Sequence, residues 1–229
     1  MHKKFHLLAL ILLLPWENLF SQNLSCMLPI LVSPRTDLSQ IRLSPIGAFG
    51  RIRKARPGIP QHYHTGIDIK RPNSNYNHEP IFPLAAGRVI SLLEDGPFAQ
   101  IIIEHELEGI GRFWSVYEHV AGILIGLDEQ VSPDKPLARF LNRQELERYG
   151  WQFDHFHLEI LKVKPRSIKP TPELPFYHYQ SYNLECYSWQ ELKHFYFDPI
   201  EFLTDHLNLD EKNDEVDKYI DRFSGTNDQ

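Results

Sequence analysis

The chain has 229 residues, of which 42% are hydrophobic and 24% are charged, and its formal net charge is -6. These fractions are typical of a globular protein and exclude a disordered chain, and the length suits one domain with a proper hydrophobic core. Because nucleic-acid binders usually present a basic face, the net negative charge argues against a nucleic-acid partner.

The N-terminus has the features of an export signal. Lys3 and Lys4 precede an apolar run at 7–14 that is too short to span a bilayer as mature structure, and Pro15 ends it. Cleavage after Ser21 predicts a signal peptide over 1–21, so we expect export to the periplasm, cell envelope or extracellular space, with no stable transmembrane segment afterwards. Cys26 is a weak candidate for a lipid anchor, because Asn23 stands three residues before it, where a leucine is usual.

Two cysteines, Cys26 and Cys186, remain after this cleavage. In an oxidising compartment they could form a disulfide or remain two thiols, and the sequence leaves both possibilities open. They are too few for a thiolate zinc site. Any metal site in this chain must therefore use histidine and carboxylate ligands.

The first half of the mature chain predicts short strands. Residues 22–42 form an N-terminal extension without a clear period, and a Gly/Pro turn at 43–50 leads into a basic stretch, 51–56. This stretch is either a solvated loop or a contact for an acidic substrate. Residues 81–92 predict two short strands broken at Gly87, with a bend or bulge there. Residues 99–107 and 112–120 flank a Gly-containing turn and predict a β-hairpin.

The second half predicts short helices around one strand. Asn142 and Glu145 form a capping-box pattern that opens a helix over 143–149, which Gly150 closes. Residues 152–160 alternate polar and apolar side chains, as in a strand with one buried face. An insertion over about 165–195 follows, and Asp198 then caps a final helix over 200–207. The acidic tail, 210–229, predicts a solvated end.

Two histidines of the 152–160 strand share one face. His155 and His157 are two residues apart, so their Cα atoms lie about 6.7 Å apart at a rise of about 3.3 Å per residue. His64 and Asp68 also share a face if their segment is extended. Three such ligands with a fourth open position are the set of a catalytic zinc site, and one carboxylate leaves Zn²⁺ positive enough to act as a Lewis acid. Glu159 is either a general base or a group that orients a ligand imidazole.

Three motifs, in this order along the chain, resemble the M23 family of zinc metallopeptidases, which contains lysostaphin-like and LytM-like peptidoglycan endopeptidases. They are His64-x-x-x-Asp68, Tyr117-x-His119 and His155-x-His157, and the flanking residues agree over roughly 43–161. The resemblance implies a mainly β fold with an antiparallel sheet or split-barrel core, over 43–209. It implies His64, Asp68 and His157 as zinc ligands and His155 and His119 as catalytic residues. The implied substrate is a peptide bond in the stem or cross-bridge of peptidoglycan, and we expect a monomer.

Two departures from the family bear on substrate and regulation. Residues 141–151 replace the usual Gly-rich loop with a predicted helix, which would reshape one wall of the substrate groove. The insertion at 165–195 could cover that groove and make the enzyme latent or narrowly specific. Two alternatives therefore remain open: a non-catalytic LytM-like envelope module that binds peptidoglycan or regulates another hydrolase, and another zinc hydrolase or lyase that uses three histidines.

Overall fold

The structure is a computed structural model that describes residues 26–207. The predicted signal peptide and the acidic tail at 210–229 lie outside these residues. The strands are β1 (Ile52–Arg53), β2 (His62–Tyr63), β3 (Ile67–Lys70), β4 (Pro80–Ile81), β5 (Gly87–Leu93), β6 (Gln100–Leu107), β7 (Gly111–Glu118), β8 (Val120–Ala121), β9 (Gln130–Val131), β10 (Ala138–Phe140), β11 (His155–Leu161), β12 (Arg166–Ser167), β13 (Tyr179–Gln180) and β14 (Tyr196–Phe197). The helices are α1 (Arg143–Tyr149), α2 (Trp189–Phe195) and α3 (Pro199–His206), with short 3-10 turns at Leu38–Gln40, Gly96–Phe98 and Trp151–Phe153.

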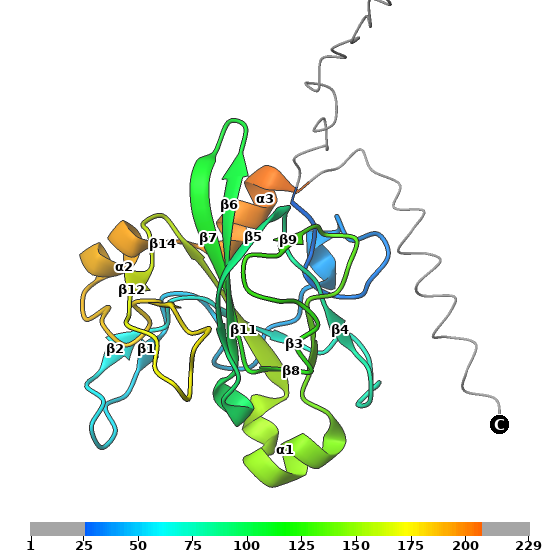
Figure 1. The fold of residues 1–229 in the computed structure, drawn as a ribbon, viewed down its shortest axis with the longest axis horizontal. Helices are drawn as coiled ribbons and strands as arrows, with labels where there is room; N and C mark the ends of the chain where they lie inside the picture. Colours follow the sequence, from blue (N-terminus) through cyan, green and yellow to red (C-terminus); the bar gives the residue numbers. More distant parts are fainter. Residues whose placement is uncertain (1–25, 208–229) are drawn as a thin grey trace, which may run out of the picture.

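A seven-stranded sheet organises the molecule (Figure 1). Its strand order is β14-β11-β7-β6-β5-β9, and β3 pairs with β11 beside β14. All pairs between these strands are antiparallel, so the predicted mainly β fold with an antiparallel sheet and short helices is confirmed. The β6–β7 hairpin forms where the sequence predicts it. The predicted irregularity near Gly87 lies instead at Ile90, where the register between β5 and β6 shifts.

Side-chain alternation gives this sheet two different faces. On β11, Phe156, Leu158 and Ile160 enter the main hydrophobic core, which α3 and the N-terminal segment also line. The intervening residues point to the opposite face, where Leu161 joins a second cluster built with α2. Figure 1 shows α3 and the blue N-terminal segment on one side of the sheet, and α2 with β1 and β2 on the other. His155, His157 and Glu159 belong to the face that carries the second cluster.

The N-terminal segment is part of the core. Cys26, Leu28 and Ile30 are fully buried, and the predicted boundary at residue 43 does not separate them from the domain. Neither Cys26 nor Cys186 forms a disulfide, and the two lie in different hydrophobic clusters. A lipid on Cys26 would require this segment to leave the core. No helix within residues 26–207 is long and apolar enough to cross a bilayer.

The two helices predicted from capping patterns form almost as expected. Asn142 and Glu145 make both hydrogen bonds of a capping box at the start of α1, and Gly150 follows its end. Asp198 caps α3, which begins one residue before the predicted start. The insertion forms a small β12–β13 hairpin and then α2, whose own capping box joins Ser188 and Glu191.

Candidate metal centre

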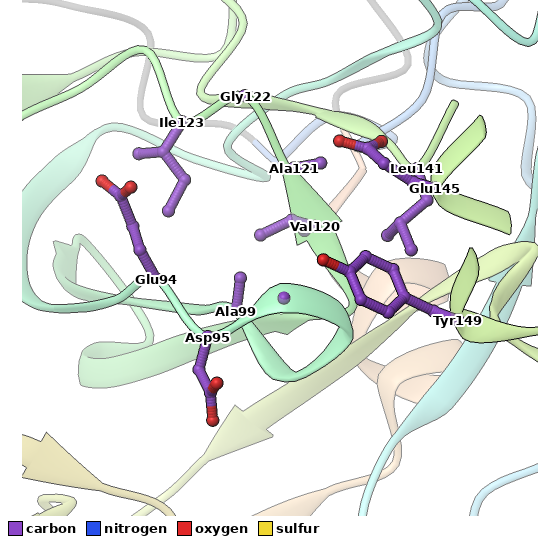
Figure 2. Close-up of a pocket in the computed structure, with 11 residues that line it drawn as sticks. Glu94, Asp95, Ala99, Val120, Ala121, Gly122, Ile123, Leu141, Glu145 and Tyr149 are labelled. Atoms are coloured by element: carbon purple, nitrogen blue, oxygen red, sulfur yellow. The ribbon is translucent and has the colours of Figure 1, made fainter. Parts of the chain in front are cut away.

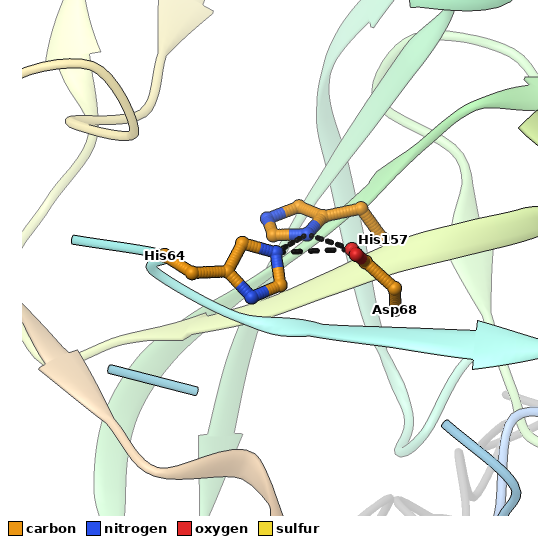
Figure 3. Close-up of side chains that lie close together, drawn as sticks. All are labelled: His64, Asp68 and His157. Atoms are coloured by element: carbon orange, nitrogen blue, oxygen red, sulfur yellow. Dashed lines mark hydrogen bonds and ion pairs between the residues drawn. The ribbon is translucent and has the colours of Figure 1, made fainter. Parts of the chain in front are cut away.

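Three side chains from two distant segments converge on the face of the sheet that carries the second cluster (Figure 3). His64 precedes β3, Asp68 lies in β3, and His157 lies in β11 directly opposite Asp68. The three ligand atoms, His64 Nε2, His157 Nδ1 and Asp68 Oδ1, lie 2.9 to 3.0 Å from one another. The structure therefore brings together the three side chains that the family resemblance implies as ligands.

The outer nitrogen of each imidazole fixes which nitrogen faces the centre. His64 Nδ1 donates to the Ala48 carbonyl at 2.9 Å, and His157 Nε2 donates to Glu159 Oε1 at 3.2 Å. In the neutral ring, the other nitrogen then carries a lone pair. Both lone pairs and a carboxylate oxygen consequently point at the same small space, the arrangement that partners of metal-ligating histidines usually impose.

Three electron pairs at this separation require a positive charge between them. Burial lowers the pKa of His157, but the hydrogen bonds and charges of Asp68 and Glu159 outweigh burial and raise it to about 10. A zinc ion fits the same place, because ligands about 2.0–2.1 Å from a tetrahedral zinc lie roughly 3.3 Å apart. The observed triangle is only a few tenths of an ångström tighter. The donor set, two imidazoles and one carboxylate, is also one that zinc prefers.

Buried polar contacts support the ligands from behind. Glu159 is fully buried, and its Oε1 accepts hydrogen bonds from both His157 and Thr65. Of the two roles that the sequence leaves open for Glu159, this contact is the one expected of a group that orients a ligand imidazole. Gly66 allows the close approach of the two ligand segments, because a Cβ there would lie 2.1 Å from the Leu158 carbonyl oxygen.

The second oxygen of Asp68 has partners that sequence reasoning did not identify. Arg53 Nη2 donates to Asp68 Oδ2 at 2.9 Å, and Ser44 Oγ lies 3.4 Å from the same oxygen. Arg53 belongs to the basic stretch, which the sequence leaves open between a solvated loop and a substrate contact. The pairing of β1 with β2 places Arg53 opposite His62, two residues before the first ligand. The contact between Arg53 and Asp68 could be foreseen only from the pairing of β1 with β2.

The two predicted catalytic histidines lie beside the three ligands. His155 Nε2 is 3.7 Å from Asp68 Oδ1, and the rings of His155 and His119 meet edge to face with centroids 5.2 Å apart. Burial lowers the pKa of both, that of His119 to about 3 with a further contribution from His155. Both imidazoles are consequently neutral at neutral pH. The rings of Phe98 and Phe153 pack edge to face against the ring of His119.

The tautomer of His119 bears on how this residue could take part in catalysis. His119 follows β7 with a φ of 60°, and its Nδ1 donates to the Pro97 carbonyl. The other nitrogen, Nε2, therefore carries a lone pair in the neutral ring. His119 can accept a proton as it stands, and it would have to gain one before it could donate to a developing oxyanion.

The insertion covers the part of the sheet next to the metal centre. Asn183 Nδ2 donates to Glu118 Oε1 at 2.9 Å, and Glu118 lies opposite His157 in the sheet. On the other side, the Cys186 carbonyl accepts from the Tyr63 amide, and the ring of Trp189 packs against Tyr63. The insertion thus joins the two sides of the centre. The ligand side chains are only 5 to 7% exposed.

A cavity of about 370 Å³ lies next to His119, outside the metal centre (Figure 2). Gly96 and Val120 line it, and they are the chain neighbours of Pro97 and His119. Tyr149, at the end of α1, closes another side. The helix that replaces the expected Gly-rich loop therefore forms a wall of this cavity, and none of the five predicted site residues lines it.

Fold and site together define a mainly antiparallel β protein with a His–Asp–His cluster able to hold a divalent cation. No protein-family model matches the chain, and no curated protein matches its sequence. Among solved structures, the chain is similar to lysostaphin in solution, with 14% identity, 73% of this chain and 52% of that chain covered, and a TM-score of 0.43.

Two further solved structures are similar at the same low level. One is a zinc-containing peptidase from Vibrio cholerae, with 18% identity, 60% of this chain and 37% of that chain covered, and a TM-score of 0.40. The other is the complex of SpoIIIAH and SpoIIQ, with 14% identity, 60% and 92% covered, and a TM-score of 0.40. The chain spans about half of the lysostaphin structure and less of the Vibrio cholerae peptidase.

Proposed function

We propose that the chain is an exported, zinc-dependent endopeptidase that hydrolyses peptide bonds in the stem or cross-bridge peptides of peptidoglycan. The convergence of two imidazole lone pairs and one carboxylate oxygen within 3.0 Å of one another carries this proposal. His64, Asp68 and His157 would hold the metal. The order of the three motifs along the chain supports the substrate class, and the signal-like N-terminus supports export to where that substrate is found.

The side chains around the centre can handle the protons of a hydrolysis. A bound zinc supplies Lewis-acid chemistry and lowers the pKa of water to about 7. His155 is neutral and lies at the edge of the ligand set, so its imidazole can take a proton there and later return one to a leaving amine. His119 offers a second neutral nitrogen beside His155. Glu159 keeps the His157 ring in the orientation that faces the metal.

The direct test is digestion of purified cell-wall sacculi by the mature protein. We expect new amine ends to appear with zinc-loaded protein and to disappear when a chelator removes the metal. The matched control is His155→Ala loaded with the same amount of zinc, which should release them at least about 100-fold more slowly. Release of amine ends that is equal with and without chelator would exclude a metallopeptidase.

A second candidate function is a metal-binding envelope module that binds peptidoglycan without cutting it. The observation that favours it is the cover over the centre, where the ligand side chains are 5 to 7% exposed and the insertion lies on the same face. The variant Trp189→Ala should loosen the insertion, because the ring of Trp189 packs on Phe49 and Tyr63. A latent peptidase gains activity on sacculi from this change, whereas a module binds sacculi and releases no amine ends in either form.

A further inference from the structure

The two oxygens of the Asp68 carboxylate have separate partners. Oδ1 lies 3.0 Å from both ligand nitrogens, whereas Oδ2 accepts a hydrogen bond from Arg53 at 2.9 Å. The Asp68 side chain is 5% exposed and that of Arg53 is 21% exposed, so the ion pair is largely shielded from water. A charged hydrogen bond in such a place is stronger than one at an exposed surface.

This division has a consequence for how Asp68 could bind a metal. A carboxylate can bind a cation through one oxygen or through both. If both oxygens of Asp68 turned to the metal, the second oxygen would take the position that a catalytic zinc site keeps open. Rotation of the carboxylate in that direction would break the hydrogen bond from Arg53 and leave the guanidinium without its anionic partner.

We propose that Arg53 is a positioning residue that holds Asp68 as a single-oxygen ligand and thereby keeps the fourth coordination position open. This inference rests on the proposed metal site, and it assigns to a residue of the basic stretch a role that acts through the Asp68 carboxylate. Its positive charge also offsets part of the negative charge of the carboxylate. Arg53 therefore leaves more of the positive charge on the metal.

Cobalt substitution tests the assignment without measuring hydrolysis. Four-coordinate Co²⁺ absorbs visible light more strongly than five- or six-coordinate Co²⁺, so the spectrum reports the coordination number. We expect the cobalt-loaded wild-type protein to give a four-coordinate spectrum and Arg53→Gln to lose intensity as both Asp68 oxygens bind. Zinc affinity in Arg53→Gln should rise, by up to roughly tenfold, because the carboxylate loses its cationic partner and gains a second bond to the metal.

Matched variants separate positioning from general charge. Arg53→Lys keeps a cationic donor and should therefore keep the wild-type spectrum. Arg56 is an exposed residue of the same stretch, so Arg56→Gln removes the same charge and should not change the spectrum. The assignment is overturned if Arg53→Gln has the same cobalt spectrum and the same zinc affinity as Arg56→Gln. If Arg53→Gln does not fold, X-ray absorption of the zinc-loaded wild type decides: two Asp68 oxygens on the metal also overturn it.

The outcomes also distinguish this inference from the proposed function. Wild-type protein that takes up neither cobalt nor zinc ends both. Protein that binds metal with the expected dependence on Arg53, but releases no amine ends from sacculi, contradicts the peptidase activity and leaves the role of Arg53 intact.

Discussion

Two buried histidines of this protein illustrate the difference between a structural and a functional imidazole. His105 in β6 is buried, donates from Nδ1 to the Ala86 carbonyl, and has Ser115 Oγ 2.7 Å from Nε2. His157 in β11 is equally buried, but its inner nitrogen faces another nitrogen and a carboxylate oxygen. Each nitrogen of His105 therefore has a hydrogen-bond partner that suits the neutral ring. The inner nitrogen of His157 faces only other acceptor atoms, so it needs a cation between it and them.

The pKa values of the two rings diverge for the same reason. Burial lowers the pKa of His105 to about 4, and the Ala86 carbonyl and the charge of Glu104 offset only part of that effect. Burial also acts on His157, but two carboxylates reverse its effect and raise the pKa to about 10. Burial by itself therefore does not identify a metal ligand; the charges that the ring faces do.

Removal of a ligand should give the largest effect. We expect His64→Ala and Asp68→Ala to lower zinc affinity by more than roughly 100-fold, since even changes beyond the ligands cost about 10- to 100-fold. His105→Ala should lower stability and leave zinc affinity unchanged. Competition with a metal-sensitive dye measures the affinity, and zinc binding by Asp68→Ala that equals wild type would remove Asp68 from the ligand set.

His155 should separate metal binding from turnover. Because its Nε2 lies 3.7 Å from Asp68 Oδ1 and outside the ligand triangle, His155→Ala should keep wild-type zinc content. We expect its hydrolysis rate to fall by at least about 100-fold, the usual contribution of a general acid or base. Metal analysis and sacculus digestion on the same sample measure the two quantities. Loss of zinc in this variant would show that His155 is a ligand.

The partners of the two rings provide a matched pair of changes. Glu159→Gln removes the charged acceptor of His157 and should lower zinc affinity by about 10- to 100-fold. Ser115→Ala removes a partner of His105 and should cost about 1–3 kcal/mol of unfolding free energy, with no change in zinc affinity. Dye competition and urea unfolding are measured on both variants. A zinc defect in Ser115→Ala would erase the contrast between the two sites.

The last expected effect is a dependence of stability on pH. The pKa of His105 is about 4 in the folded chain and about 6.5 when unfolded. The unfolded state therefore binds the proton more readily, and stability is full above about pH 6.5 and falls as the pH drops toward 4. At pH 5 this amounts to a loss of about 2 kcal/mol. Urea unfolding at pH 7 and pH 5 should show a smaller loss in His105→Gln than in wild type; equal losses contradict the assignment.

Several elements follow from short stretches of the sequence. The capping box of Asn142 and Glu145 places α1 to the residue, because both hydrogen bonds form within four residues of chain. The Gly-containing turn at 108–111 similarly predicts the β6–β7 hairpin. The spacing of His155 and His157 puts both on one face of β11, since side chains alternate along any strand. Each of these features depends on local geometry alone.

Only the tertiary structure decides what meets at the metal centre. His64 and His157 are 93 residues apart, and the pairing of β3 with β11 brings their rings together. The contact of Arg53 with Asp68, the tautomer of His119 and the cover formed by the insertion likewise depend on segments that pack from elsewhere in the chain. Residue types and spacing determined which side chains could bind a metal. Packing between distant segments determined which atom of each side chain faces it, because a lone pair is aimed by the partner on the other side of the ring.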